Sequence, residues 1–297
     1  MSSPSQDPWT VKRLLEWTTQ FFTRKDVDSP RLSSEMLLSH VLGCPRIKLY
    51  TDFDKHVPEA KLSEYRELVR RAATHEPVAY LTGRAPFFNL DLAVSRDVLI
   101  PRPDTETLVE NVVQLARAVS GFEAPRVLDL CTGSGAIALA VASRLKNAVV
   151  VATDISDAAL AVARGNAERL GLSSRIIFLR GDLFSALNGH AEAQPFDLLL
   201  ANPPYIPSAD IAHLDASVRD FEPHLALDGG EDGMDLHRRI IEASESRLRP
   251  GGRMYLEIQF DQGPAMLELA KHNPFLSDCR ILKDAAGNER VFTATRS

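Results

Sequence analysis

The chain has 297 residues, more than one domain usually holds, so one large or two unequal domains are expected. Its 44% hydrophobic and 25% charged residues are ordinary for a globular protein. A formal net charge of -6 argues against a protein whose main task is to wrap nucleic acid, and we expect no direct sequence-specific nucleic-acid binding. No apolar run reaches the length of a membrane span, so no membrane association is expected.

The three cysteines, Cys44, Cys131 and Cys279, are odd in number and show no CxxC spacing. A disulfide framework or a metal site is therefore not expected, and a cytoplasmic location is the simplest setting. Residues 1–9 are polar, contain prolines and lack an apolar signal core, which predicts a frayed tail. We expect a monomer.

Residues 9–82 show helical periodicity. The segment 31–42 has an apolar period near 3.6 and stops at Gly43, a natural helix end. Residues 58–75 place apolar side chains from Leu62 to Ala72 on one face. Helices this short must cover one another, so a small helical bundle is expected over residues 1–83.

Residues 84–103 change character and predict a β-hairpin linker. We expect its strands at residues 87–94 and 97–100, separated by a short polar turn. Residues 101–106 then open a helix with Asp104 as its N-cap. A second domain is expected over residues 104–297.

From residue 126 onward, apolar runs alternate with helical patterns, which predicts an α/β fold. The predicted helices are 136–145, 157–170 and 236–248, and the predicted strands are 126–130, 148–154, 176–179, 196–201, 254–258, 280–283 and 290–294. Such runs indicate a mostly parallel seven-stranded, Rossmann-like sheet with both faces covered and an antiparallel pair at its end.

The first of these strands runs into a glycine loop. Glycines there let a ligand approach the backbone, and an acid after the next strand, here Asp154, typically holds ribose hydroxyls. The carboxyl ends of parallel strands face one crevice, so this loop, Asp154, Asp182 with Leu183, and Asn202 should line it together. The loop residues expected at the cofactor are Asp129, Cys131, Thr132, Gly133, Ser134 and Gly135.

The glycine loop lacks the third glycine of the GxGxxG pattern, since Leu139 stands near that place. Nicotinamide binding is therefore disfavoured. A loop of two glycines preceded by an acid suits S-adenosyl-L-methionine, which has no pyrophosphate and carries a zwitterionic tail. Asp129 could receive its ammonium group directly or through water.

The fourth strand ends in the corner Asn202-Pro203-Pro204-Tyr205. Proline fixes φ and donates no hydrogen bond, so the corner is stiff and presents acceptors. Asn202 Oδ1 and the Pro203 carbonyl could accept both N–H groups of a flat amide, and Tyr205 could pack on its plane. This arrangement predicts catalysis by positioning and electrostatics.

These segments resemble the release factor glutamine methyltransferases of the PrmC/HemK type. The resemblance runs through nearly the whole chain, and its specific part is the segment Ile-Pro-Arg-Pro-Asp-Thr-Glu at residues 100–106. It implies a helical N-terminal domain that docks the release factor, and a substrate-side turn with Arg102 and Glu106. Cys131 departs from the family, which often has glycine there, and Gln259 stands where glycine is frequent.

The resemblance also implies the substrate, the glutamine of the Gly-Gly-Gln loop in bacterial class 1 peptide chain release factors, methylated on its side-chain nitrogen. A related family that methylates a ribosomal-protein glutamine usually has Val-Pro-Arg-Ser-Pro in place of the 100–106 segment. An N6-adenine DNA methyltransferase could use the same corner on a flipped base. A non-catalytic adenosine-binding scaffold is the remaining alternative, and it has no use for the corner.

Overall fold

The computed structural model describes residues 9–297, which form two compact units. The helical unit consists of residues 9–83 and the segment Asp215–Phe221, and the sheet unit consists of Arg84–Leu214 and Glu222–Ser297. Residues 84–103, expected to form a linker, are part of the sheet unit. Of the predicted tail at residues 1–9, residues 1–8 lie outside the described residues.

The helical unit confirms the predicted helical N-terminal region. Its helices are α1 (Val11–Thr23), α2 (Pro30–Leu42), α3 (Arg46–Thr51), α4 (Glu59–Ala72), α5 (Val78–Thr82) and α9 (Ala216–Arg219). The apolar faces of α1 to α5 form one core, in which the Tyr65 hydroxyl lies 3.0 Å from Ser34 Oγ. Gly43 ends α2 in the left-handed conformation, as its position predicts.

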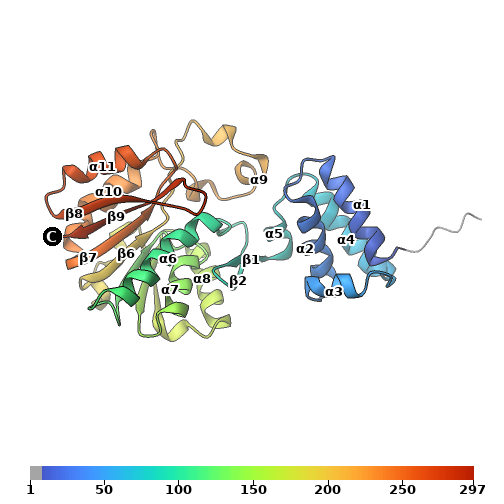
Figure 1. Ribbon diagram of the computed structural model, residues 1–297, viewed down its shortest axis with the longest axis horizontal. Helices are drawn as coiled ribbons and strands as arrows, with labels where there is room; N and C mark the ends of the chain where they lie inside the picture. Colours follow the sequence, from blue (N-terminus) through green and yellow to red (C-terminus); the bar gives the residue numbers. More distant parts are fainter. Residues whose placement is uncertain (1–8) are drawn as a thin grey trace, which may run out of the picture. The chain divides into compact units, whose positions relative to one another are not determined.

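The sheet unit contains the seven-stranded, mostly parallel sheet that the sequence predicts (Figure 1). Its spatial order is β5-β4-β3-β6-β7-β9-β8, with β9 antiparallel to both β7 and β8. The strands are β3 (Arg126–Leu130), β4 (Val149–Asp154), β5 (Ile176–Arg180), β6 (Phe196–Ala201), β7 (Leu248–Glu257), β8 (Leu276–Lys283) and β9 (Glu289–Arg296).

Both faces of this sheet are covered by helices. One face packs against α6 (Pro103–Ala118), α7 (Ala136–Arg144) and α8 (Asp157–Arg169). The opposite face packs against α10 (Asp235–Ala243) and α11 (Gly263–Lys271). Neighbouring residues of one strand, such as Val127 and Leu128, serve opposite cores because side chains alternate across a strand.

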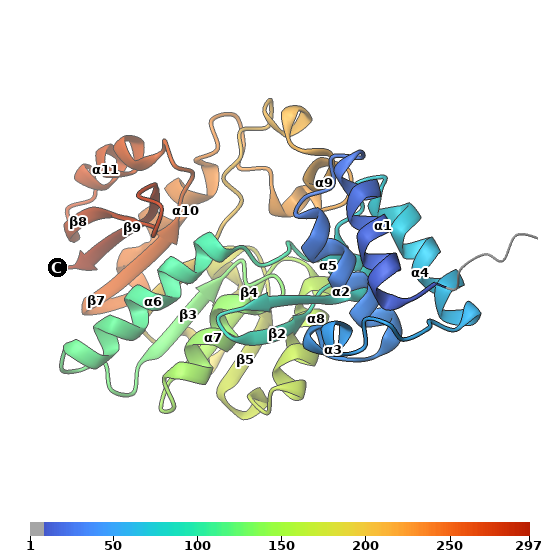
Figure 2. The same ribbon diagram turned by 45° about the vertical axis from the view of Figure 1, so that its right-hand side comes forward.

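The hairpin lies earlier in the chain than predicted. It pairs β1 (Arg84–Phe87) with β2 (Leu90–Ala93), and the expected second strand at residues 97–100 is wrong. Phe88 and Asn89 both have positive φ, as a two-residue type I′ turn requires. The Phe88 ring packs on the apolar core, which explains why a bulky residue occupies a turn position. Figure 2 shows this hairpin alongside α8.

Other boundaries also differ from the prediction, and β8 begins at Leu276 rather than at residue 280. Asp104 is not the N-cap of α6, because Arg102 occupies that position and Pro103 opens the helix. Helix α10 ends at Ala243, five residues before the predicted end, and β7 begins at Leu248 rather than at residue 254. An irregularity in the pairing of β6 with β7 accommodates the extra residues of β7. Helix α11 was not predicted.

The order of the strands reverses between β3 and β6. From β3 the chain proceeds outward to β4 and β5, then returns to β6 on the other side of β3. Leu130 and Ala201, the last residues of these two strands, are paired. Ligands of open α/β sheets bind outside the carboxyl ends of the strands at such a point. No helix within residues 9–297 is long and apolar enough to cross a membrane.

Candidate active site

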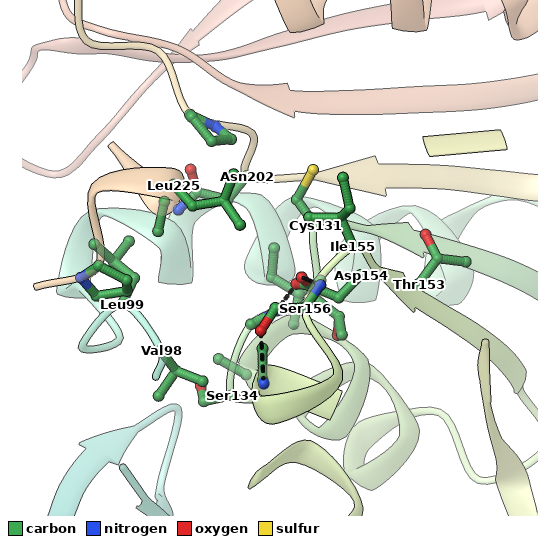
Figure 3. Close-up of a pocket in the computed structure, with 18 of the residues that line it drawn as sticks. Val98, Leu99, Cys131, Ser134, Thr153, Asp154, Ile155, Ser156, Asn202 and Leu225 are labelled. Carbon is green, nitrogen blue, oxygen red and sulfur yellow. Dashed lines mark hydrogen bonds between the residues drawn. The ribbon is translucent and has the colours of Figure 1, made fainter. Parts of the chain in front are cut away.

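A cavity of about 370 Å³ opens at the carboxyl ends of the parallel strands, where the strand order reverses. Figure 3 shows Cys131 after β3, Asp154 at the end of β4 and Asn202 after β6 around this cavity. All of its lining residues belong to the sheet unit. The predicted site residues that line it are Arg102, Cys131, Thr132, Gly133, Ser134, Asp154, Asp182, Leu183, Asn202 and Pro204.

Asp129 lies beneath the glycine loop and does not line the cavity. Its buried carboxylate accepts hydrogen bonds at Oδ2 from the Thr132 hydroxyl at 2.6 Å and the Ala138 amide at 3.2 Å. Burial raises the pKa of Asp129 to about 7. Oδ1 is also buried and has no hydrogen-bond partner among the described residues, so it can accept one more donor.

Gly135, also expected at the cofactor, is not among the lining residues. It begins α7 with a φ of 82°, and a Cβ there would lie 3.2 Å from the Ala163 side chain of α8. Its glycine therefore serves the close packing of α7 on α8.

Asp154 is held by the backbone at the mouth of the glycine loop. Its Oδ2 accepts from the Gly133 amide at 2.9 Å. Its Oδ1 accepts from the Ser156 amide, also at 2.9 Å (Figure 3). Burial raises the pKa of Asp154, and these amides partly offset the rise. Asp154 lines the cavity, and each oxygen of an ionised carboxylate has a second lone pair, so the group can accept from a pair of vicinal hydroxyls.

The loops that follow β5 and β3 also line the cavity. Asp182 follows β5 and forms an ion pair with Arg239 of α10 at 2.6 Å. Leu183 comes next with a positive φ of 47°. Cys131 also has a positive φ, 57°, which explains why glycine suits this place and a small residue is accepted. Burial raises the pKa of the Cys131 thiol, which disfavours nucleophilic chemistry.

The Asn202 side chain is oriented by helix α6. Its Nδ2 donates to Thr105 Oγ1 at 3.2 Å, which leaves Oδ1 as an acceptor at the cavity that Asn202 lines. Pro204 lines the same cavity, whereas Pro203 is buried behind it and is not a lining residue. Tyr205 does not line the cavity either, since its hydroxyl donates to the buried Glu257 at 3.2 Å.

The backbone of this corner is fixed from behind. Gly229 approaches it so closely that a Cβ there would lie 2.7 Å from Tyr205 Cα and 2.8 Å from the Pro204 carbonyl oxygen. Gln262 adds a hydrogen bond of 3.0 Å to the Tyr205 carbonyl. The corner is therefore rigid because of its prolines and because of its packing.

The two residues of the predicted substrate-side turn have different surroundings. Arg102 lines the cavity and forms an ion pair with Glu222, a buried carboxylate that also accepts from the Ile100 amide at 3.2 Å. Glu106 does not line the cavity. It accepts from the Phe88 amide at 2.8 Å and so supports the hairpin turn.

Comparison with known proteins gives the family. Residues 13–83 match the PrmC N-terminal domain family, and residues 122–259 match a methyltransferase domain family. A release factor glutamine methyltransferase of Rhodopirellula baltica is 43% identical over 299 residues, which cover 100% of each chain. That of Geobacter sulfurreducens is 41% identical over 283 residues, 95% of each chain. The chain belongs to the release factor glutamine methyltransferase family.

A solved structure agrees with this fold. The human methyltransferase 10 domain containing protein is 20% identical, with a TM-score of 0.50 over 71% of this chain and 89% of that chain. At that identity the likeness supports the fold alone, and the full-length relatives carry the assignment to the release factor glutamine methyltransferases.

Sequence reasoning missed the residues that support the site of this methyltransferase from behind, and several that line its cavity. Thr105 and Glu257 support the asparagine corner, and Glu222 holds Arg102. Both Glu222 and Glu257 are almost fully buried, which the sequence does not reveal for a charged residue. Thr105 also lines the cavity, and the other lining residues that were not singled out include Val98, Leu99, Ile155, Ser156, Leu225 and Arg239.

Proposed function

We propose that the protein transfers a methyl group from S-adenosyl-L-methionine to the side-chain amide nitrogen of a glutamine in a class 1 peptide chain release factor. The observation that carries this proposal is that Asn202 opens into the same cavity as Asp154 and the glycine loop. A cofactor site and an amide-holding corner are thereby brought together. The proposed cytoplasmic location follows from this substrate.

The residues of the cavity fit the proposed cofactor. Asp154 offers two fixed carboxylate oxygens to ribose hydroxyls, and the orphaned Asp129 Oδ1 offers an acceptor to an ammonium group. Asp182 and Leu183 line the same cavity. S-adenosyl-L-methionine supplies an electrophilic methyl group on a sulfonium sulfur, so the protein needs no nucleophile of its own.

The chain's part in the reaction is to position and polarise the glutamine amide. The amide nitrogen is a poor nucleophile because its lone pair is delocalised into the carbonyl. Asn202 Oδ1 accepts one N–H, which directs the nitrogen and favours positive charge on it as the N–C bond forms and the bond from the methyl carbon to sulfur breaks. The methylated nitrogen then loses one proton to water. Pro203, predicted to accept the other N–H, lies behind the cavity and stiffens the corner instead. Tyr205, anchored through Glu257, stiffens the corner from outside the cavity.

The experiment uses labelled S-adenosyl-L-methionine with the purified full-length protein and three acceptors in separate reactions: a class 1 release factor, ribosomal proteins and duplex DNA. We expect label in the release factor only. Label in DNA or in a ribosomal protein instead would contradict the proposal. The alternatives are not favoured, since relatives from 37% to 43% identical over nearly full length are named release factor glutamine methyltransferases.

A further inference from the structure

Asn166 of α8 is a fully buried asparagine that the site described above does not use. Its Oδ1 accepts from the Ala93 amide and from the Arg169 guanidinium, both at 2.7 Å. Its Nδ2 donates to the Ala93 carbonyl at 3.0 Å and to the Ser134 carbonyl at 2.9 Å. Both protons and both lone pairs of the amide are thereby used. The side chain joins the hairpin, which lies alongside α8 (Figure 2), to the glycine loop.

Ala93 of β2 fixes which way round this amide lies. Its N–H needs an acceptor and its C=O needs a donor, and Asn166 pairs with both, as a neighbouring strand would. Turned over, the amide would place its NH₂ against the Ala93 N–H and its oxygen against two carbonyl oxygens. The hairpin therefore orients the Nδ2 that reaches the glycine loop.

The atom held at the glycine loop is a carbonyl that the backbone of α7 does not satisfy. Ser134 precedes Gly135, the N-cap of α7. If α7 began one residue earlier, the Ala138 amide would donate to the Ser134 carbonyl, but it donates to Asp129 Oδ2 at 3.2 Å instead. Ser134 is 3% exposed, so little solvent reaches this carbonyl. Asn166 supplies the missing donor.

The peptide between Ser134 and Gly135 is held at both ends. Its C=O accepts from Asn166, and its N–H donates to the Thr132 carbonyl at 2.8 Å. Gly135 has a φ of 82°, and glycine adopts either sign of φ readily, so backbone sterics alone do not fix this peptide. With Asn166 in place, a turned peptide would set the Gly135 N–H against Nδ2 and two carbonyl oxygens against each other.

Helix α8 thereby supports the glycine loop at two adjacent positions. Ala163 lies one turn before Asn166, on the same face of the helix. It packs so close to the loop that a Cβ on Gly135 would lie 3.2 Å from its side chain. This contact limits the approach of the loop but gives it no direction. The hydrogen bond from Asn166 to the Ser134 carbonyl supplies the direction.

We propose that Asn166 is a positioning residue that holds the Ser134–Gly135 peptide in its observed orientation, and that the affinity for S-adenosyl-L-methionine depends on this orientation. Thr132, Gly133 and Ser134 line the cavity, so a turned peptide changes the wall that faces the ligand. The effect on the affinity for S-adenosyl-L-methionine rests on the proposed function, whereas the orientation of the peptide does not.

Two substitutions in the full-length protein test the proposal. Asn166→Ala releases the peptide. Asn166→Asp favours the turned peptide, because a carboxylate accepts the Gly135 N–H and cannot donate to the Ser134 carbonyl. Since only molecules with the observed orientation bind tightly, we expect the affinity for S-adenosyl-L-methionine to fall about tenfold in the first variant and about a hundredfold in the second. Calorimetry at pH 8 measures both values.

Asn273→Asp is the matched control. Asn273 also bonds the backbone with both ends of its amide, because Nδ2 donates to the Ile241 carbonyl and Oδ1 accepts from the Phe275 amide, both at 3.0 Å. It follows α11 and does not line the cavity. The control should lose stability in urea unfolding without any change in its affinity for S-adenosyl-L-methionine.

A second measurement needs no ligand. In Asn166→Ala, the Gly135 amide should exchange with solvent at least about tenfold faster than in the unaltered protein, as followed by ¹⁵N spectra. The Leu139 amide, which donates to the Gly135 carbonyl at 2.8 Å, is the internal reference and should keep its rate. General destabilisation of α7 would accelerate both amides alike.

The two measurements separate this proposal from the proposed function. If the unaltered protein does not bind S-adenosyl-L-methionine, the proposed cofactor is wrong, and faster exchange at Gly135 alone still supports the role of Asn166 in orienting the peptide. The proposal is overturned if the Gly135 and Leu139 amides change alike. It is also overturned if both Asn166 variants bind S-adenosyl-L-methionine as tightly as Asn273→Asp.

Discussion

Asn202 carries the proposed chemistry, and its surroundings give one side-chain amide a fixed direction. Thr105 holds its nitrogen at 3.2 Å, and the carbonyl oxygen is left at the cavity. Asp154 is oriented by a different means, through two backbone amides at 2.9 Å. At both positions the supporting atoms come from structure that is already rigid, so no reorganisation is needed when a ligand binds.

Asn202→Ala is expected to abolish detectable methyl transfer while changing the affinity for S-adenosyl-L-methionine only a few-fold. The substitution removes the acceptor for the substrate N–H but leaves Asp154 and the glycine loop in place. Labelled-methyl transfer and calorimetric binding measure the two effects. As a control, Asn188→Ala changes an exposed asparagine outside the cavity. A rate near that of the unaltered protein in Asn202→Ala would show that the corner is only structural.

Asp129→Asn should change how stability depends on pH. Burial raises the pKa of Asp129 from 3.8 to about 7, so the folded protein holds a proton that the unfolded chain has already lost. Ionising this buried carboxyl therefore lowers the free energy of unfolding as pH rises from about 4 to about 7, by at most about 4 kcal/mol.

The asparagine variant lacks this contribution and should gain stability relative to the unaltered, ligand-free protein as pH rises through that window. Urea unfolding at pH 5 and pH 8 measures the difference. Equal pH dependence in both proteins would contradict the account of Asp129. The same variant should bind S-adenosyl-L-methionine more weakly, because it loses a negative charge beside the cavity.

The site residues that could be predicted from the sequence are those whose position follows from an adjacent, recognisable strand. Asp154 and Asn202 each follow a recognisable strand, so their place at one edge of the sheet could be predicted. Thr105 could not, because it lies 97 residues from Asn202 and meets it only through the packing of α6. Glu257 could not either, since nothing local marks a glutamate as buried.

At the scale of elements, the asparagine corner depends on the segment that packs behind it. Gly229→Ala is expected to displace the corner, because its Cβ would lie 2.7 Å from Tyr205 Cα. We expect a loss of about 1–3 kcal/mol in the free energy of unfolding and a fall in kcat of about a hundredfold. Denaturant unfolding and methyl-transfer assays measure both.

Gly165→Ala is the matched control for that substitution. Gly165 lies within α8, and no atom lies within 4 Å of an added Cβ. The change should therefore stabilise the protein by a few tenths to about 1 kcal/mol and leave kcat unchanged. If the two alanine variants behaved alike, the close approach at Gly229 would not matter to the corner.

The elements themselves were largely predictable from apolar periodicity, and the errors share a cause. The hairpin was placed too late because Phe88 in a turn looks like a strand residue until its core contacts are known. The early start of β7 was missed because Pro250 and the glycines after it predict a turn, whereas the sheet accommodates them as an irregularity beside β6. In both places tertiary packing overrode local preference.

At the scale of the whole molecule, the described residues form two units, for which we expect different roles. The cavity and all of its lining residues belong to the sheet unit. The helical unit matches the PrmC N-terminal domain family, and we propose that it docks the release factor. The net charge of -6 suits recognition of a protein better than of a nucleic-acid backbone.

Hydrogen exchange should reveal this division. Binding of S-adenosylhomocysteine, the product, is expected to slow exchange at the lining segments near residues 131–137, 153–156 and 181–183. Exchange in residues 9–83 should not change, because none of them lines the cavity. Protection spread equally over both units would contradict a cofactor site built from the sheet unit alone.

The proposed substrate atom is the side-chain nitrogen of a release factor glutamine. Fragmentation mass spectrometry of the release factor after incubation with the protein and S-adenosyl-L-methionine tests it most directly. The account predicts a single methyl group on the glutamine of the Gly-Gly-Gln peptide, absent when Asn202→Ala replaces the unaltered protein. A methyl group on any other residue of the factor, or none on that peptide, would contradict it.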